Sequence, residues 1–370
     1  MKAKEAIPST NSDSISSSFY EKRKVLVTGG SGFIGSAIVK ELVKQGAIVR
    51  ALLEPGGDFA NLEGSDVERV ECDIRDLEGV TRAVKGAEYV FHSAALYRFW
   101  SKDKKAFEEV NVGGTKNVML AFEKEGCSRL VYTSTVGTLG LSGGKDVPSN
   151  EESHVDIDHL FGNYKKTKYV AEHEVLKRAS EGLPVVLTQP TMPIGAGDRG
   201  PTPSGRLVLD FLNGKMPAYV DTTLNIVDVR DVAAGHLLAG EKGKLGRSYI
   251  LGGTNLSMAE ILGCLSEITG LKAPTIEIPH FVPLGAAYLS EFFQSKIAGK
   301  QPFVELEAVK MSGTHMSFDD SRARNELGHS SREATCALAS AVDFYLKSGY
   351  VKAGQVKKLN LEKLEAALRN

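Results

Sequence analysis

Short apolar segments alternate with helical patterns through the first half of the chain. Six segments have the length and composition of buried strands: Val25–Val27, Ile48–Leu53, Val67–Cys72, Tyr89–His92, Leu130–Thr133 and Val185–Gln189. Apolar residues recur at helical spacing between them, over Phe33–Gln45, Leu77–Val84, Lys104–Glu125 and Tyr164–Glu181. This alternation predicts an α/β fold in which a parallel sheet is covered by helices, over residues 24–190.

The pattern changes after Pro190, where prolines and glycines form an irregular connection. Beyond it we expect the strands Ala218–Val220, Asn225–Val229 and Tyr249–Leu251. The predicted helices are Arg206–Leu212, Val232–Ala239, Ser257–Thr269, Arg322–Leu327 and Ser331–Lys347, of which the third opens with a capping box. Residues 191–350 are therefore predicted to form a smaller α+β substrate-binding region, some of whose elements return to the first domain.

The two ends of the chain have distinct compositions. Residues 1–23 are rich in serine and lack an apolar core, which predicts a disordered tail and not a secretory signal. Residues 351–370 carry leucines among charged residues and predict an amphipathic helix or tail that packs on the body or on a second subunit. The most apolar stretch, Phe281–Ala298, contains Glu291 and Lys296, so we expect an amphipathic helix and no membrane span.

Composition excludes several classes of function. The 370 residues are 42% hydrophobic and 25% charged, with a formal net charge of −1, so no broad basic surface predicts nucleic-acid binding. The four cysteines lie far apart with neither paired nor metal-ligand spacing. We therefore expect reduced thiols, no metal site, a cytoplasmic protein and a small-molecule substrate.

A glycine turn follows the first predicted strand and opens the first predicted helix. It contains Gly29, Gly30, Gly32 and Gly35. Glycines in such a turn allow a tight bend, close approach of main-chain N–H groups to a pyrophosphate, and close packing of helix on strand. The helix N-terminus adds unpaired N–H groups. The turn thus predicts a Rossmann-type, doubly wound parallel sheet that binds a dinucleotide.

Residues at the ends of the next strands can contact the rest of the cofactor. Glu54 lies 25 residues beyond Gly29, where a carboxylate binds ribose hydroxyls and repels a 2′-phosphate, so we expect NAD in preference to NADP. Arg50 is the neighbour that can weaken this inference. Asp73 can accept from the adenine amino group and Ile74 can pack on its ring. Ala94 and Ala95 follow the fourth strand and are small enough to leave room for a cofactor, whereas His92 is interpreted as structural.

Tyr164 and Lys168 lie one turn apart at the start of a predicted helix. A free tyrosine has a pKa near 10, and a neighbouring ammonium lowers it by stabilising the phenolate. The pair is therefore a candidate general acid–base. Ser134 and Thr135 end the fifth strand, and either hydroxyl can bind the substrate oxygen beside Tyr164.

These motifs resemble the extended short-chain dehydrogenase/reductase superfamily, also called the NAD-dependent epimerase/dehydratase superfamily. The resemblance rests on Thr28–Gly35, Asp73–Ile74, Asn111–Asn117, Thr133–Thr135 and the Tyr164/Lys168 pair. Residues Gln189–Gly195 are similar to its dihydroflavonol-reductase-like branch. The hopanoid-associated sugar epimerase family is the closest match for Pro201–Arg206, Asp210–Asp221, Asn225–His236, Tyr249–Gly253 and Phe318–Gly328.

The resemblance implies roles for individual residues. Tyr164 is then the catalytic acid–base, Lys168 lowers its pKa, and Thr135, not Ser134, orients the reacting oxygen. Cofactor contacts are implied for Gly29, Gly32, Phe33, Ile34, Gly35, Tyr164, Lys168 (which can also hold a ribose) and, beside the nicotinamide, Pro190. Val136 and Gly137 replace the Asp-Glu pair that sugar-nucleotide dehydratases carry, which disfavours a 4,6-dehydratase.

Three functions remain open from the sequence. The leading hypothesis is an NAD(P)-dependent oxidoreductase, acting reversibly on a carbonyl/secondary-alcohol pair and forming a homodimer. The alternatives are a nucleotide-sugar epimerase with tightly bound NAD and a non-catalytic dinucleotide sensor. Arg199 and Arg206 are available for a sugar diphosphate, whereas Met192, Phe211 and Leu212 can form an apolar pocket.

Overall fold

The computed structural model describes residues 19–97, 103, 105–142, 147–290, 309–310 and 313–369. Three of the predictions extend outside the described residues: the tail over residues 1–18, the helix start at Lys104, and residues 291–298 of the predicted helix Phe281–Ala298. The structure begins that last helix at Phe281, as α9 Phe281–Ser290.

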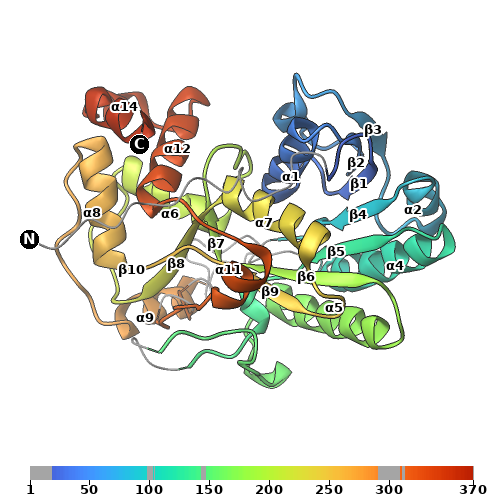
Figure 1. The fold of residues 1–370 in the computed structure, drawn as a ribbon. Coiled ribbons are helices and arrows are strands. Elements are labelled where there is room, and N and C mark those ends of the chain that lie inside the picture. Colours follow the sequence, from blue (N-terminus) through green and yellow to red (C-terminus); the bar gives the residue numbers. More distant parts are fainter. Residues whose placement is uncertain are drawn as a thin grey trace, which may run out of the picture.

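A seven-stranded sheet forms the larger part of the molecule (Figure 1). Its order is β3-β2-β1-β4-β5-β6-β9, and every neighbouring pair is parallel. The strands are β1 Lys24–Thr28, β2 Ile48–Leu53, β3 Glu68–Glu71, β4 Tyr89–His92, β5 Arg129–Thr133, β6 Val185–Pro190 and β9 Ser248–Leu251. The strand order reverses between β1 and β4, and the crevice outside the carboxyl ends at such a reversal is where dinucleotides bind.

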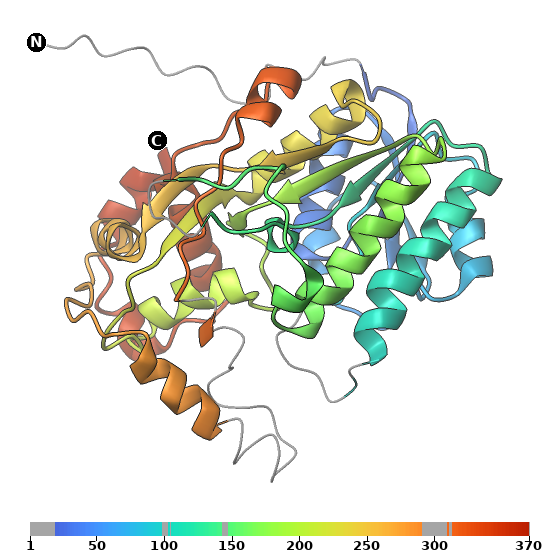
Figure 2. The same ribbon diagram turned by 90° about the horizontal axis from the view of Figure 1, so that it is seen from below.

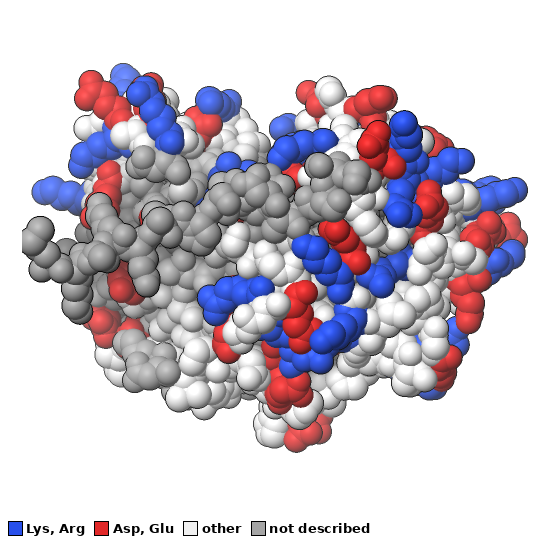
Figure 3. All heavy atoms as spheres, in the orientation of Figure 1, with Lys and Arg blue, Asp and Glu red and all other residues white. Residues whose placement is uncertain are grey.

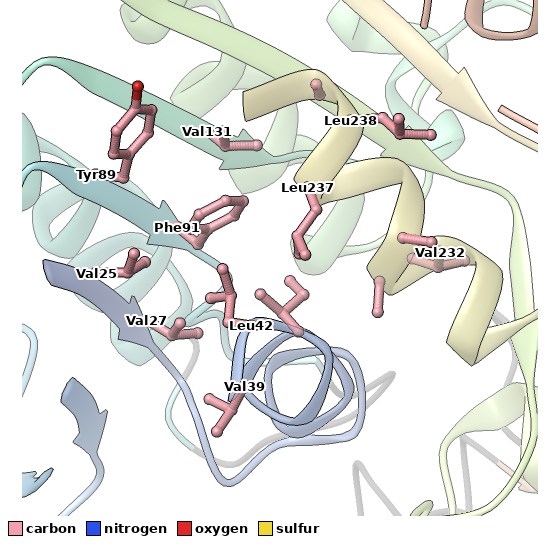
Figure 4. Close-up of a cluster of buried hydrophobic side chains, with 14 of the residues drawn as sticks. Val25, Val27, Val39, Leu42, Tyr89, Phe91, Val131, Val232, Leu237 and Leu238 are labelled. Carbon is pink, nitrogen blue, oxygen red and sulfur yellow. The ribbon is translucent and has the colours of Figure 1, made fainter. Parts of the chain in front are cut away.

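Helices cover both faces of this sheet. The helices α1 Phe33–Lys44 and α7 Val229–Lys242 pack on one face, over a core that Figure 4 shows. The other face is covered by α2 Leu77–Val84, α4 Gly114–Lys124 and α5 Asn163–Ser180, with α4 and α5 side by side (Figure 2). The predicted α/β fold, a doubly wound Rossmann-type sheet, is confirmed.

A second, smaller sheet has the order β10-β8-β7 and its own hydrophobic core. Its strands are β7 Met192–Ile194, β8 Thr223–Asp228 and β10 Thr254–Ser257. Four helices pack around it: α6 Pro203–Leu212, α8 Met258–Thr269, α12 Ala334–Lys347 and α14 Leu361–Arg369. The helix α14 packs on α8 and α12, so the amphipathic C-terminal segment docks on the body of its own chain.

Several predicted elements differ from the structure. The strand Ala218–Val220 is wrong, because only Tyr219 pairs, through an isolated bridge to Glu277. The short strands β7 and β10 were missed because three or four residues carry too little alternation to show a period. The predicted helix 104–125 is divided into α3 Lys105–Glu108, a π-helical turn Glu109–Gly113, and α4.

Residues 19–23 also differ from the predicted disordered tail. Tyr20 is fully buried, and its hydroxyl donates to the Leu237 carbonyl oxygen at 2.7 Å. Its ring packs against those of Tyr89 and Phe91 in the core beneath α7. The burial of Tyr20, with Phe19 packed partly buried beside it, therefore holds the chain in place before β1 begins.

Candidate active site

The glycine turn is shaped by contacts that exclude side chains. Gly29 has φ +67°, and a Cβ there would lie 2.7 Å from the Ala94 Cα atom. A Cβ on Gly35 would lie 2.1 Å from the Gly29 carbonyl oxygen. Helix α1 starts at Phe33 with neither a side-chain cap on Gly32 nor an acidic residue in its first turn. Main-chain N–H groups of Phe33 and its neighbours are thus suited to an anion, and the turn fits the pyrophosphate of a dinucleotide.

The adenosine side of this crevice carries Glu54, which is exposed directly after β2. Arg50, the residue that could have favoured a 2′-phosphate, is engaged elsewhere. Its guanidinium donates to the carbonyl oxygens of Ala83 at 2.7 Å and Lys85 at 3.0 Å, at the end of α2. The nearest arginine in sequence therefore does not offset the charge of Glu54.

Asp73 and Ile74 follow β3, and both have partners within the protein. The Arg75 guanidinium binds both carboxylate oxygens of Asp73 at 2.6–3.1 Å and holds the pKa of this carboxyl below its ordinary value. An adenine amino group would therefore share Asp73 with Arg75. Ile74 is buried against Gly114, where an added Cβ would lie 2.6 Å from its Cγ2 atom.

His92 connects three elements at the carboxyl edge of the sheet. Its Nδ1 atom lies 2.7 Å from Thr28 Oγ1, and its Nε2 atom lies 2.9 Å from Thr115 Oγ1 on α4. Burial, together with the charge of Lys168, lowers the pKa of His92 to about 3. The imidazole is neutral near pH 7 and holds β1, β4 and α4 in register, as expected for a structural histidine.

Lys168 is fully enclosed beneath this edge of the sheet. Its ammonium donates to the Tyr132 hydroxyl at 2.8 Å and to the Thr133 carbonyl oxygen at 2.7 Å. Burial lowers the pKa of Lys168 to about 7, and the charge of Glu172 opposes that shift. Sequence reasoning missed Tyr132, although a tyrosine on an interior strand needs a buried hydrogen-bond partner.

Tyr164 lies one turn before Lys168 on α5 and is half-buried. Its ring centroid is 4.6 Å from that of Tyr97, in the segment that follows Ala95. The Asn111 side chain, in the π-helical turn, accepts from the Leu96 N–H at 2.7 Å and donates to Thr167 Oγ1 at 3.0 Å. Asn111 therefore links this segment to α5. The sequence did not reveal this role, because the π-helical turn that contains Asn111 was predicted as part of a continuous helix.

The two candidate hydroxyls at the end of β5 occupy different environments. Ser134 is buried, and its hydroxyl donates to the Glu172 carboxylate. Thr135 is half-buried, and its Oγ1 atom accepts from the Gly137 N–H at 3.1 Å, a bond that leaves its own proton free to be donated. Of the two hydroxyls, that of Ser134 is thus committed to Glu172, and that of Thr135 is the less buried one.

Small or buried residues line the remaining edge of the site. Ala94 is half-buried, and its N–H donates to Thr28 Oγ1 at 3.2 Å. Ala95 is exposed, and Pro190 is buried at the end of β6, paired with Leu251 of β9. The structure therefore places both alanines and Pro190 at the same sheet edge as Thr135.

The connection after β7 approaches the cofactor side of the molecule. Asn61 donates to the carbonyl oxygens of Ser31, in the glycine turn, at 3.2 Å and of Gly197 at 2.8 Å. Arg199 pairs with Asp58 at 2.7 Å. Arg199 therefore binds the segment after β2 rather than facing a pocket of the second region.

The apolar pocket predicted from Phe211 and Leu212 is wrong. Both side chains are buried in the core of the second sheet, packed among residues of α6, α8 and α12. Met192 is half-buried against the same core. Helical periodicity identified their burial correctly but cannot distinguish a core from a binding pocket.

The fold and this site define a nicotinamide-dinucleotide enzyme. A glycine cradle, a carboxylate after β2 and a tyrosine–lysine pair converge on one edge of a Rossmann-type sheet. The model described as the NAD dependent epimerase/dehydratase family matches residues 25–252, and the chain belongs to this family. It is an NAD-dependent oxidoreductase of the extended short-chain dehydrogenase/reductase type, as the sequence predicted.

Three known proteins illustrate the relationship. A putative dihydroflavonol 4-reductase of Synechocystis sp. is 42% identical over 331 residues, which cover 88% of this chain and 95% of that protein. Sterol demethylase protein B of Methylococcus capsulatus is 33% identical over 327 residues, covering 88% and 99%. The crystal structure of gox2253 has a TM-score of 0.79 at 38% identity and covers 90% of this chain and 100% of that one.

The charged side chains of the protein are spread over its surface. Acidic and basic side chains are interspersed on the face drawn in Figure 3. Within the described ranges, no helix is long and apolar enough to cross a membrane. In the same part of the chain, no three His, Cys, Asp or Glu side chains are grouped so as to hold a metal ion.

Proposed function

We propose that the enzyme interconverts an apolar ketone and its secondary alcohol with net turnover of NADH. The observation that carries this proposal is an aromatic rim beside Tyr164. It comprises Tyr97, whose ring is tilted by 47° against that of Tyr164 at a centroid distance of 4.6 Å, and Phe161, which is 54% exposed three residues before Tyr164. The Lys310 ammonium lies 4.6 Å from the centre of the Phe161 ring and 5.7 Å from that of Tyr288 on α9. A substrate that approaches Tyr164 beside these rings meets apolar surface.

Two further observations favour an apolar substrate over a nucleotide sugar. Arg199, a candidate for a sugar diphosphate, is paired with Asp58, and Arg206 donates through Nε to the Pro201 carbonyl oxygen at 3.4 Å. The pairing with Asp58 engages the Arg199 guanidinium, whereas the single long bond of the exposed Arg206 does not prevent it from binding phosphate. The names of two relatives, a putative dihydroflavonol 4-reductase and sterol demethylase protein B, refer to apolar ring systems.

The residues of the site can divide the chemistry as follows. In the reductive direction the Tyr164 hydroxyl donates its proton to the substrate oxygen, and the Thr135 hydroxyl donates a hydrogen bond to the same atom. Lys168 stabilises the phenolate that remains and so lowers the pKa of Tyr164. Bound NADH supplies the hydride chemistry at the substrate carbon. The oxidative direction reverses each proton transfer.

Net oxidation of NADH tests this function directly. The purified enzyme is incubated with NADH and a panel of flavanone, steroid and prenylated ring ketones, and separately with UDP-sugars. We expect ketone-dependent loss of NADH absorbance that Thr135→Val reduces about 100-fold, since a hydrogen bond to developing charge is removed. Retained NAD that co-purifies, together with an epimerised sugar and no net NADH loss, would instead establish the epimerase.

We also propose that Glu54 makes the enzyme prefer NADH. Glu54→Arg should shift the ratio of NADPH to NADH affinities about tenfold or more toward NADPH, because one charged hydrogen bond to phosphate replaces a repulsion. The measurement is the quenching of intrinsic fluorescence by each cofactor. Glu63→Arg makes the same charge change nine residues further on, at an exposed position, and should leave the ratio unchanged. An unchanged ratio in Glu54→Arg would remove Glu54 from the ribose site.

We further propose a cytoplasmic homodimer. Leu120 on α4 and Val170 on α5 are 49% and 36% exposed on two adjacent helices. A second copy of the same face would cover both side chains, as isologous dimers do. Burial raises the pKa of the Cys127 thiol to about 11 and raises that of Cys72, which suits unreactive, reduced cysteines.

A further inference from the structure

A buried carboxylate lies on α5 one turn beyond Lys168. Glu172 is 6% exposed and is surrounded by hydrogen-bonding groups from two strand ends. Ser134 donates its hydroxyl proton to Oε2, and Gln189 Nε2 lies 3.2 Å from Oε1 and 3.3 Å from Oε2. Thr138 Oγ1 lies 2.9 Å from Oε2. Donors thus converge on Glu172 from both β5 and β6, as a buried carboxylate requires.

These contacts hold the residues on either side of Thr135. Ser134 directly precedes Thr135, and Thr138 Oγ1 lies 2.8 Å from the Thr135 carbonyl oxygen as well as near Glu172. The Thr138 N–H donates to the same carbonyl oxygen at 3.2 Å. The main chain around Thr135 is therefore attached to Glu172 at two points. This attachment determines where the Thr135 hydroxyl lies relative to α5.

The same carboxylate acts electrostatically on Lys168. Burial disfavours the ammonium form of Lys168, and the negative charge of Glu172 favours it. The two direct partners of the ammonium, the Tyr132 hydroxyl and the Thr133 carbonyl oxygen, are uncharged. Charged or titratable groups around this cluster are Lys168, Tyr132, Tyr164, His92 and, against Gly137, Lys165. None of these five groups is a carboxylate, so Glu172 supplies the negative charge of the cluster.

We propose that Glu172 is a positioning residue for the reaction, which keeps Lys168 an ammonium beside Tyr164 and fixes the main chain that presents Thr135. The role rests on the proposed function, because Lys168 and Thr135 act there through Tyr164 and the substrate oxygen. Glu172 itself does not touch substrate or cofactor in this role. Its effect is transmitted by its charge, which acts on Lys168, and by the hydroxyl groups of Ser134 and Thr138.

Titration of the Tyr164 phenolate tests the electrostatic part without any substrate. The near-ultraviolet absorbance of the enzyme is followed against pH, and the same titration of Tyr164→Phe is subtracted from it. In Glu172→Gln we expect the Tyr164 midpoint to rise by about one pH unit, because Lys168 loses its proton more readily and no longer stabilises the phenolate. The acidic limb of the kcat profile for alcohol oxidation should move by the same amount.

Three variants separate this role from a structural one. Glu172→Asp keeps the charge and should keep the midpoint near that of the wild type. Glu174→Gln makes the same neutralisation two residues further on, where the carboxylate pairs with Lys116 at 3.6 Å, and should not move the midpoint. In a Lys168→Met background, Glu172→Gln should have no further effect, because the charge acts through Lys168. A midpoint that does not move in folded Glu172→Gln, or that moves equally without Lys168, overturns the proposal.

Thr138→Val tests the second part of the proposal, which is that Glu172 fixes the main chain around Thr135. This variant keeps the proposal testable if Glu172→Gln does not fold. Removing this hydroxyl takes away one of the two attachments of the Thr135 main chain to Glu172 without changing any charge. We expect kcat to fall about tenfold, as for a misplaced catalytic group, while the phenolate midpoint is unchanged. An unchanged kcat contradicts the role. If the wild type turns over no ketone at all, the proposed function fails, whereas the phenolate titration still decides the effect of Glu172 on Lys168.

Discussion

We expect Tyr164→Phe to lower kcat for ketone reduction by about 1,000-fold, within the usual range for removal of a general acid. The phenyl ring keeps the packing against Tyr97, whose ring centroid lies 4.6 Å away, so the fold should be unchanged. The variant loses the only proton that the proposed mechanism delivers to the substrate oxygen. Because the phenyl ring, the glycine turn and Glu54 all stay in place, most of the NADH affinity should be retained.

Single-turnover reduction under saturating NADH, with NADH binding measured separately by fluorescence, checks this prediction. Tyr169→Phe is the matched control. Tyr169 lies five residues further along α5, with its ring stacked 3.9 Å from that of His173, and its hydroxyl has no part in the mechanism. A Tyr164→Phe enzyme that keeps wild-type turnover would exclude Tyr164 as the acid.

Lys168→Met is expected to abolish most activity and yet to stabilise the fold. The pKa of Lys168 falls from an ordinary 10.5 to about 7 because the side chain is completely buried. Below pH 7 this shift disfavours the folded state by about 5 kcal/mol relative to an uncharged side chain. Methionine loses two hydrogen bonds, to Tyr132 and Thr133, worth about 1 kcal/mol each, and it leaves Glu172 buried without its cation. We expect a net gain of about 2 kcal/mol near pH 7.

The difference in stability between Lys168→Met and wild type should depend on pH, and the pKa shift of Lys168 gives the direction. Between pH 7 and pH 10.5 the unfolded chain holds a proton on Lys168 that the folded protein has released, so wild-type stability rises with pH in that window. The methionine variant lacks this dependence. Its advantage in urea unfolding should therefore shrink steadily from pH 7 to pH 10.

Exposed Lys166→Met serves as the control, and its stability relative to wild type should not change with pH. A constant difference between Lys168→Met and wild type would show that Lys168 is not buried with a lowered pKa. Turnover by Lys168→Met should fall about 100-fold or more, since the Tyr164 phenolate loses its stabilising charge.

Local patterns predicted most of the larger sheet correctly. The strands β1, β2, β4, β5 and β6 and the helices between them were found because each carries its own apolar periodicity and its own glycine or proline boundary. Elements whose placement depends on distant partners were missed or incomplete. The strand β9, predicted as Tyr249–Leu251 in the second region, joins β6 in the first sheet. Which sheet a short apolar strand joins is a long-range choice that its own sequence does not contain.

The candidate site shows the same difference between local sequence patterns and contacts that depend on distant residues. Glycine spacing and the four-residue interval between Tyr164 and Lys168 determined the class of enzyme, because both are short-range patterns with direct geometric consequences. The sequence by itself thus determined the family and the Rossmann-type sheet, and it predicted which residues form the cofactor cradle and the acid–base pair. The resemblance had already favoured Thr135 over Ser134, and the tertiary structure supplied the physical difference by bringing Glu172 to the Ser134 hydroxyl. Only the tertiary structure showed Arg50 and Arg199 to be engaged elsewhere. These choices depend on side chains far apart in the chain, which meet only when the sheet and its helices have packed.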